Sequence, residues 1–210
     1  MSDSELYEEY REAGQQLHSK ILDAYSDREL ILDSAEALGL EHDGTNIFYE
    51  SESDMTVHYE FLLYEYQWDG KTAAERFNEA KRWDTATERR VLAATLEAET
   101  SLFAVTAVDE SDYRFTITDV LGSGEEVSVL DINLSQHIQP GIVLFVRPVQ
   151  YENFATTSGV FFPFSPDELE YLLDEYENRA DHLDETPTST WRYAAFYDLY
   201  RECGIQTVYR

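Results

Sequence analysis

The chain has 210 residues, 43% of them hydrophobic and 14% aromatic, so it is long enough to fold around a core without a metal or a disulfide. Its net charge is −28, from 43 acidic residues against 15 basic ones, which argues against a direct grip on nucleic-acid phosphates or on an anionic membrane surface. The single cysteine, Cys203, excludes an intrachain disulfide, and we interpret it as a small buried side chain.

The charge is distributed along the whole chain instead of forming one acidic tail. The basic residues are 12 Arg and only 3 Lys. This pattern predicts a uniformly acidic folded surface, which repels itself in dilute buffer and is screened in concentrated salt. The composition resembles that of cytoplasmic proteins of salt-accumulating haloarchaea. We therefore interpret the acidity as an adaptation to salt; an acidic mesophilic protein and a mimic of nucleic-acid charge are the alternatives.

Targeting signals are not evident in the sequence. The N-terminal segment MSDSELYEEYREAG has neither a basic n-region nor an apolar h-region, so we expect no secretory signal. The longest apolar run, Ile142 to Val146, is far shorter than the ~18 residues of a membrane helix. We expect a soluble cytoplasmic protein with no membrane partner.

The N-terminal half is predicted to be helical. Helical spacing of apolar residues predicts two helices before a stop at Gly39, then a loop over residues 41–53. Asp54 is expected to cap a third helix that ends near Gly70, at an Asp-Gly turn. Three capping boxes mark helix starts, and the first of them is the start of the second helix. They are Ser26-Asp27-Arg28-Glu29, Thr72-Ala73-Ala74-Glu75 and Thr85-Ala86-Thr87-Glu88.

At Ser101 the hydrophobic period changes from about 3.6 to 2, which predicts strands. Five short runs are separated by turns: 102–108, 113–118, 126–130, 142–147 and 156–162. The fourth run is apolar on both faces and is therefore expected to be central. Short strands joined by tight turns predict an antiparallel meander that curls into a small barrel.

Two further helices are expected after the strands. Ser165-Pro166-Asp167-Glu168 has the pattern of a helix start, with a capping Ser and Pro at the first helical position. A break at Pro187 precedes a last helix that ends at Gly204. The predicted fold is α+β, with a helical region (1–99), a small antiparallel β-barrel (100–163) and C-terminal helices packed on the barrel (164–210), all in one compact unit.

The middle of the chain carries an ordered series of short motifs. Those motifs are His58-Tyr59-Glu60-Phe61-Leu62-Leu63-Tyr64-Glu65-Tyr66, Thr72-Ala73-Ala74-Glu75-Arg76-Phe77, Glu88-Arg89-Arg90-Val91-Leu92, Ser101-Leu102-Phe103-Ala104-Val105, Asp119 to Val129, Ser135 to Ile142, and Arg147 near a strand end. Over roughly residues 55 to 175 the series resembles an uncharacterised bacterial and archaeal protein family. Members of that family are often joined to a SEC-C motif, a Cys-rich zinc-binding tail implicated in protein contacts. With one cysteine this chain cannot supply that tail, and Ile142 stands where the family usually has Asp. The resemblance implies an architecture and no assigned chemistry.

Catalytic and metal-binding signatures are missing from the sequence. The five histidines are scattered singly, without a HExxH, CxxC or His-x-His pattern. There is no Gly-x-Ser-x-Gly elbow, Walker A loop or Gly-x-Gly-x-x-Gly fingerprint. With 43 acids, carboxylate pairs occur by chance and carry no weight. We therefore predict no catalytic residue, no metal site and no cofactor.

Four residues are candidates for binding. Arg147 and Asp119 are expected at strand ends of the barrel, either as a structural ion pair or as a pocket whose arginine binds a carboxylate. Tyr66 and Trp68 belong to a surplus of aromatic residues that covers more than one helical face, which suggests a dimer or partner surface.

The function hypothesis follows from these observations. We expect a non-enzymatic cytoplasmic interaction module adapted to high salt, with an unknown protein partner or with self-association and no direct nucleic-acid contact. The alternatives are an enzyme or small-ligand binder with a pocket near Arg147 and Asp119, and an acidic mimic of nucleic acid.

Overall fold

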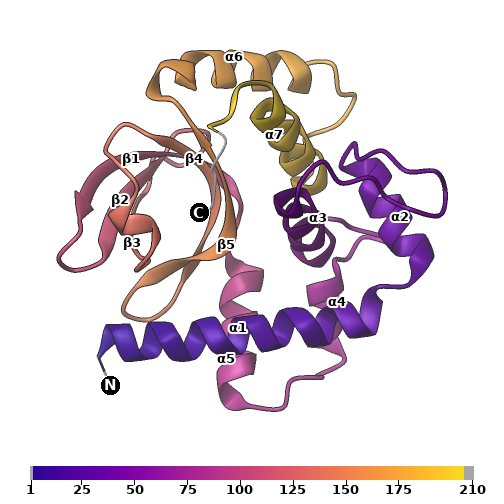
Figure 1. Ribbon diagram of the computed structural model, residues 1–210, viewed down its shortest axis with the longest axis horizontal. Coiled ribbons are helices and arrows are strands. Elements are labelled where there is room, and N and C mark those ends of the chain that lie inside the picture. Colours follow the sequence, from indigo (N-terminus) through magenta and orange to yellow (C-terminus); the bar gives the residue numbers. More distant parts are fainter. Residues whose placement is uncertain (1, 206–210) are drawn as a thin grey trace. The chain divides into compact units, whose positions relative to one another are not determined.

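The structure, a computed structural model, describes residues 2–205 and confirms the predicted α+β class, with an N-terminal helical part, a closed five-stranded barrel and C-terminal helices (Figure 1). The chain divides into two compact units. The first contains residues 1–97 and 189–194, and the second contains residues 98–188 and 195–210. The last helix, α7 (Ser189–Cys203), therefore begins in the first unit and continues in the second.

Five helices and the first turns of α7 build the first unit. They are α1 (Asp3–Tyr25), α2 (Arg28–Ala37), α3 (Glu52–Tyr64), α4 (Ala73–Glu79) and α5 (Ala86–Glu97). Along α1 the buried residues recur every three or four positions, as expected for an amphipathic helix. An ion pair fixes α1 to α5, because Lys20 Nζ lies 2.7 Å from the carboxylate of Glu88, whose side chain is almost fully buried.

The helix starts confirm that polar side chains cap the helices, but at two helices the capping residue is not the one predicted. Thr72 caps α4 with Glu75 in a complete capping box, as predicted. The cap of α2 is Asp27, whose carboxylate accepts from the Leu30 N–H, so the prediction that Ser26 caps this helix is wrong. Both residues are good caps, and Ser26 instead ends α1, where its own N–H donates to a helix carbonyl.

A similar shift occurs at α3. The predicted cap, Asp54, is the third helical residue, and Ser51 is the cap. Ser51 accepts from the Asp54 N–H while the Asp54 carboxylate accepts from the Ser51 N–H. The pair is a capping box with Asp in place of the usual Glu or Gln, so the helix starts at Glu52.

The second unit contains the barrel. Its strands are β1 (Ser101–Asp109), β2 (Arg114–Asp119), β3 (Glu126–Leu130), β4 (Val143–Gln150) and β5 (Ala155–Phe164). They close in the order β1-β2-β3-β5-β4, with β4 pairing back to β1. All pairings are antiparallel except the short contact of β3 with β5, which is parallel. This order is that of the OB-type five-stranded barrel.

The parallel contact departs from the predicted meander. The hairpin β4–β5 is inserted so that β5, and not β4, lies beside β3. The 3-10 helix η1 (Leu134–Gln136) lies in the connection from β3 to β4. As predicted, β4 is buried along most of its length, and its first five residues are all buried.

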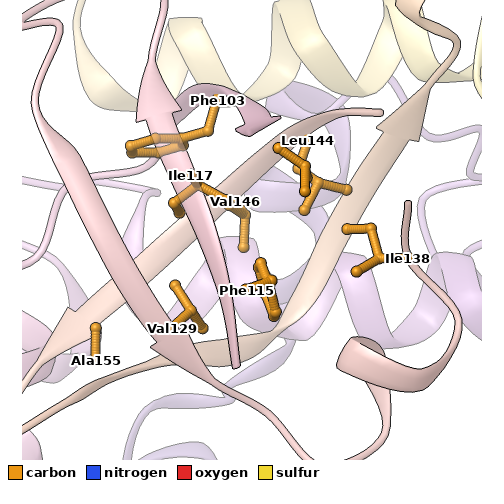
Figure 2. Close-up of a cluster of buried hydrophobic side chains, with 9 residues drawn as sticks. Phe103, Phe115, Ile117, Val129, Ile138, Leu144, Val146 and Ala155 are labelled. Carbon is orange, nitrogen blue, oxygen red and sulfur yellow. The ribbon is translucent and has the colours of Figure 1, made fainter. Parts of the chain in front are cut away.

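The barrel encloses its own hydrophobic core (Figure 2). Nine buried side chains from the strands and from Ile138 fill it: Phe103, Val105, Phe115, Ile117, Val129, Ile138, Leu144, Val146 and Ala155. Residues two apart on one strand face the same side, which explains why Phe115 and Ile117 both point inward. The interior is therefore packed with apolar side chains.

The first helix after the barrel differs in its start from the prediction. Ser165 makes no side-chain cap, and residues Pro166–Glu168 form a 3-10 turn, η2, before α6 (Leu169–Ala180). The guanidinium of Arg179 then joins α6 to α7 through Asp198 at 2.8 Å and Glu202 at 3.2 Å.

None of the helices among residues 2–205 combines the length and apolar character needed to cross a lipid bilayer.

Candidate functional site

Asp119 organises the turn that leaves β2. Its carboxylate accepts from the backbone N–H groups of Leu121, Gly122 and Ser123, and from the Ser101 hydroxyl at 2.9 Å. Partial burial raises the pKa of this carboxyl, but the hydrogen bonds from Ser123 and Ser101 outweigh burial and leave its pKa below the usual value. Asp119 is thus a turn anchor that also fixes the start of β1.

Arg147 lies on the other side of the start of β1. It is 6% exposed, and it sits where the β4–β5 pairing is irregular, between Val146 and Pro148. Its Nε donates to the Thr100 hydroxyl at 3.2 Å and its Nη1 donates to the Ala98 carbonyl at 2.9 Å. These contacts hold the chain that enters β1, while Asp119 holds the next residue, so the two candidates serve the same strand through different partners.

The structure brings the other two candidates, Tyr66 and Trp68, together in the first unit. Their rings are nearly parallel, with centroids 6.5 Å apart, and the ring of Tyr25 from the end of α1 lies 6.2 Å from Trp68. All three side chains are partly exposed. Burial, followed by the nearby carboxylates of Asp33 and Glu36, raises the pKa of Tyr66.

Arg76, which the sequence analysis missed, completes this group. Its guanidinium carbon lies 4.5 Å above the centre of the Trp68 ring, within the range of a cation–π contact. One of its terminal nitrogens donates to the Trp68 carbonyl. Its Nε is buried without a hydrogen-bond partner, and within residues 2–205 no carboxylate pairs with it. An arginine without an acidic partner is unexpected in a chain with 43 acids.

A second arginine extends the group. The guanidinium of Arg82, on the segment after α4, lies 5.7 Å from the centre of the Tyr25 ring, and its side chain is exposed. We call Tyr25, Tyr66, Trp68, Arg76 and Arg82 the Arg–aromatic cluster. Arg76 is positioned by α4 and its Thr72 cap, and Trp68 by a tight turn whose bridge pairs Trp68 with Lys71.

A charge pattern in the sequence could have revealed this cluster. Six of the 15 basic residues fall between positions 71 and 90, against four acidic ones, so this stretch is positive in a chain of net charge −28. The basic residues are Lys71, Arg76, Lys81, Arg82, Arg89 and Arg90. Counting charge over the whole chain hides such a local reversal of sign.

A buried polar chain in the first unit was also missed. The ring of His58 is fully buried, with Nε2 2.9 Å from the Ser34 hydroxyl and Nδ1 2.8 Å from the Tyr49 hydroxyl. Ser34 donates its proton to the Ile31 carbonyl. The Nε2–H tautomer satisfies every group, because Tyr49 donates to Nδ1 and Nε2 donates to Ser34. This series of hydrogen bonds fixes the loop before α3. It leaves Ser34 no base that would accept its proton.

Among the residues that the structure describes, no group of three or more His, Cys, Asp or Glu side chains could hold a metal ion. Cys203 is partly buried, and burial, with the nearby carboxylates of Glu168 and Glu202, raises the pKa of its thiol. A raised pKa disfavours the nucleophilic thiolate.

The fold and this cluster define an α+β protein with an OB-type barrel and, on its helical unit, an arginine–aromatic surface. The family comparison then places the chain. Over residues 1–210 it matches a family described as "Family of unknown function (DUF7986)", and it belongs to that family. No curated protein and no solved structure matches the chain.

Proposed function

We propose that this protein is a non-enzymatic interaction module that binds a protein partner through the Arg–aromatic cluster. One observation carries the proposal: Arg76 is stacked on Trp68 and has no carboxylate partner among residues 2–205. Trp, Tyr and Arg are the residue types that most often dominate the energetics of protein interfaces. The cluster consists of these three types alone.

The geometry also lowers the cost of binding. Immobilising a long side chain at an interface costs roughly 0.5–1.5 kcal/mol, and a side chain already held in place avoids most of that cost. Arg76 is held by the Trp68 ring and by the Trp68 carbonyl before any partner arrives. Its remaining N–H donors are therefore oriented in advance.

The acidic surface fits a module that works in concentrated salt. In the proposal, the −28 charge keeps the protein soluble in a salty cytoplasm and does not select the partner. The stretch of residues 71–90 has a net positive charge and so differs from the acidic rest of the surface. Selection would then depend on the cluster and not on the net charge.

Site-specific photo-crosslinking tests the proposal. A benzophenone amino acid replaces Tyr66 in the cluster or Tyr171, an exposed aromatic residue on α6, and crosslinking is done in cells of the source organism. We expect one discrete adduct from position 66 that is absent from position 171.

Two arginine variants provide the matched comparison. Arg76→Gln should abolish the adduct, whereas Arg89→Gln should preserve it, because Arg89 also lies over a tryptophan, Trp83, at 5.9 Å but outside the cluster. The same adduct from both crosslinker positions, or its equal loss in both variants, would overturn the proposal.

A further inference from the structure

We infer that the Arg–aromatic cluster recognises carboxylates, so that the partner presents a short acidic segment, and that this recognition strengthens as salt is added. The inference rests on the proposed function and names the chemistry of the partner. It follows from three observations: the unused donors of Arg76, a second guanidinium over the neighbouring Tyr25 ring, and the sign of the charge on the rest of the chain.

The first observation concerns hydrogen bonding at Arg76. A guanidinium has five N–H donors, and Arg76 uses one of them within the described chain. Its Nε is buried without a partner, and a buried donor left unpaired costs about 1–3 kcal/mol. A ligand carboxylate cannot reach this enclosed atom and would bind the terminal nitrogens, since Nη1 makes no hydrogen bond within residues 2–205 and is not among the buried atoms. The planar fork of arginine matches the planar carboxylate, and the charge strengthens each hydrogen bond.

The second observation is the arrangement of the two arginines. Arg76 lies over Trp68, Arg82 lies over Tyr25, and the two rings are 6.2 Å apart. Two cations held against adjoining rings fit a ligand with neighbouring carboxylates better than one with a single charge. The aromatic rings supply an apolar floor for the side-chain stems of such a segment.

The third observation predicts an unusual dependence on salt. A chain of net charge −28 repels an acidic peptide at long range, and this repulsion is screened when the Debye length falls from about 10 Å at 0.1 M salt to about 3 Å at 1 M. A hydrogen-bonded contact with the Arg76 guanidinium over the Trp68 ring acts at short range, so salt weakens it less than it weakens the long-range repulsion. Affinity for an acidic segment should therefore rise with KCl, the reverse of ordinary charge-driven binding.

Fluorescence anisotropy with synthetic peptides tests the inference on the full chain. The probes are a rhodamine-labelled hexaglutamate and the matching hexaglutamine, each titrated at about 0.1 M and about 2 M KCl, where the Debye length differs several-fold. We expect binding of hexaglutamate alone, tighter at the higher salt. Arg76→Gln should weaken it by about tenfold or more, the range of a lost charged hydrogen bond. Arg89→Gln should leave it unchanged, and circular dichroism checks that each variant is folded.

The outcomes separate this inference from the proposed function. If Tyr66 crosslinks to a partner but hexaglutamate does not bind, the interaction surface remains and its acidic specificity is rejected. Binding that weakens with KCl, or that Arg89→Gln reduces as much as Arg76→Gln, also overturns the inference. Inorganic phosphate serves as a competitor: displacement of hexaglutamate at equal anion concentration would assign the site to phosphate and overturn the carboxylate assignment.

Discussion

The Thr157 hydroxyl of β5 donates to the Asp131 carboxylate, which follows β3, at 3.1 Å, and both residues are buried. This hydrogen bond joins the two strands whose pairing is parallel and short, with one register pair, Val129 with Ala155. The other carboxylate oxygen of Asp131 accepts from the N–H groups of Asn133 and Leu134. Asp131 therefore closes the barrel and starts η1 at the same time.

Replacing Thr157 with Val should destabilise the protein by about 1–3 kcal/mol, because it leaves a buried carboxylate oxygen without its hydroxyl donor at nearly constant volume. Urea unfolding at constant KCl measures the change. Thr118→Val on β2 is the control, since Thr118 is only partly buried. Equal midpoints for the two variants would show that the hydrogen bond does not hold β5 to β3.

Two of the three histidines in the first unit, His18 and His58, should make stability depend on pH. Burial lowers the pKa of His58 to about 4, and burial, followed by the charge of Arg11, lowers the pKa of His18 to about 4. An unfolded histidine has a pKa near 6.5, so the unfolded chain binds more protons between these values. The free energy of unfolding is then complete above pH 6.5 and is lost as the pH falls towards 4, at up to about 1.4 kcal/mol per pH unit for each histidine.

His58→Gln should remove about half of this slope, whatever it does to stability at pH 7. Unfolding free energies measured between pH 5 and 6.5, where most carboxylates stay ionised, would show the difference. The readout is a slope, so a uniform loss of stability in the variant does not obscure it. An unchanged slope would mean that His58 titrates normally in the folded protein.

Arg147 should prove to be structural. Arg147→Lys keeps the charge but loses the paired geometry by which Nε reaches Thr100 and Nη1 reaches Ala98, and hydrogen bonds from charged donors contribute about 1.5–3 kcal/mol each. We expect a lower unfolding midpoint and unchanged binding of the acidic peptide. Normal stability in this variant would revive the alternative of a pocket arginine.

Sequence patterns predicted the local structure well and the long-range pairing less well. The capping box at Thr72 and the strand limits of β3 depend on neighbouring residues, so a local pattern suffices to find them. Ser165 failed as a cap because a Pro-started 3-10 turn satisfies its segment through the backbone, where Glu168 N–H donates to the Ser165 carbonyl. β5 lies beside β3, where Asp131 and Thr157, 26 positions apart, form a buried hydrogen bond that no local pattern carries.

In the candidate site, too, residues close in sequence were predicted and contacts between distant residues were not. Tyr66 and Trp68 were found because they lie two positions apart in a sequence whose aromatic residues exceed what one helical face can bury. Arg76 was missed because the charge was counted over the whole chain, and its place over the Trp68 ring without a carboxylate partner within residues 2–205 is visible only in the structure. Ser34 and His58 are 24 positions apart, so their buried hydrogen bond has no sequence signature.

The excess of acidic residues should make the stability of the fold depend on the salt concentration. At low ionic strength the repulsion among excess carboxylates of a −28 chain opposes compaction, and KCl screens it. The melting temperature should therefore rise steeply between about 0.1 M and about 1 M KCl, where the Debye length contracts from about 10 Å to about 3 Å, and level off above that. Equimolar NaCl should act alike if screening is the cause. Melting that is equally high in dilute buffer would refute salt adaptation and would favour the reading of the acidic surface as a mimic of nucleic-acid charge.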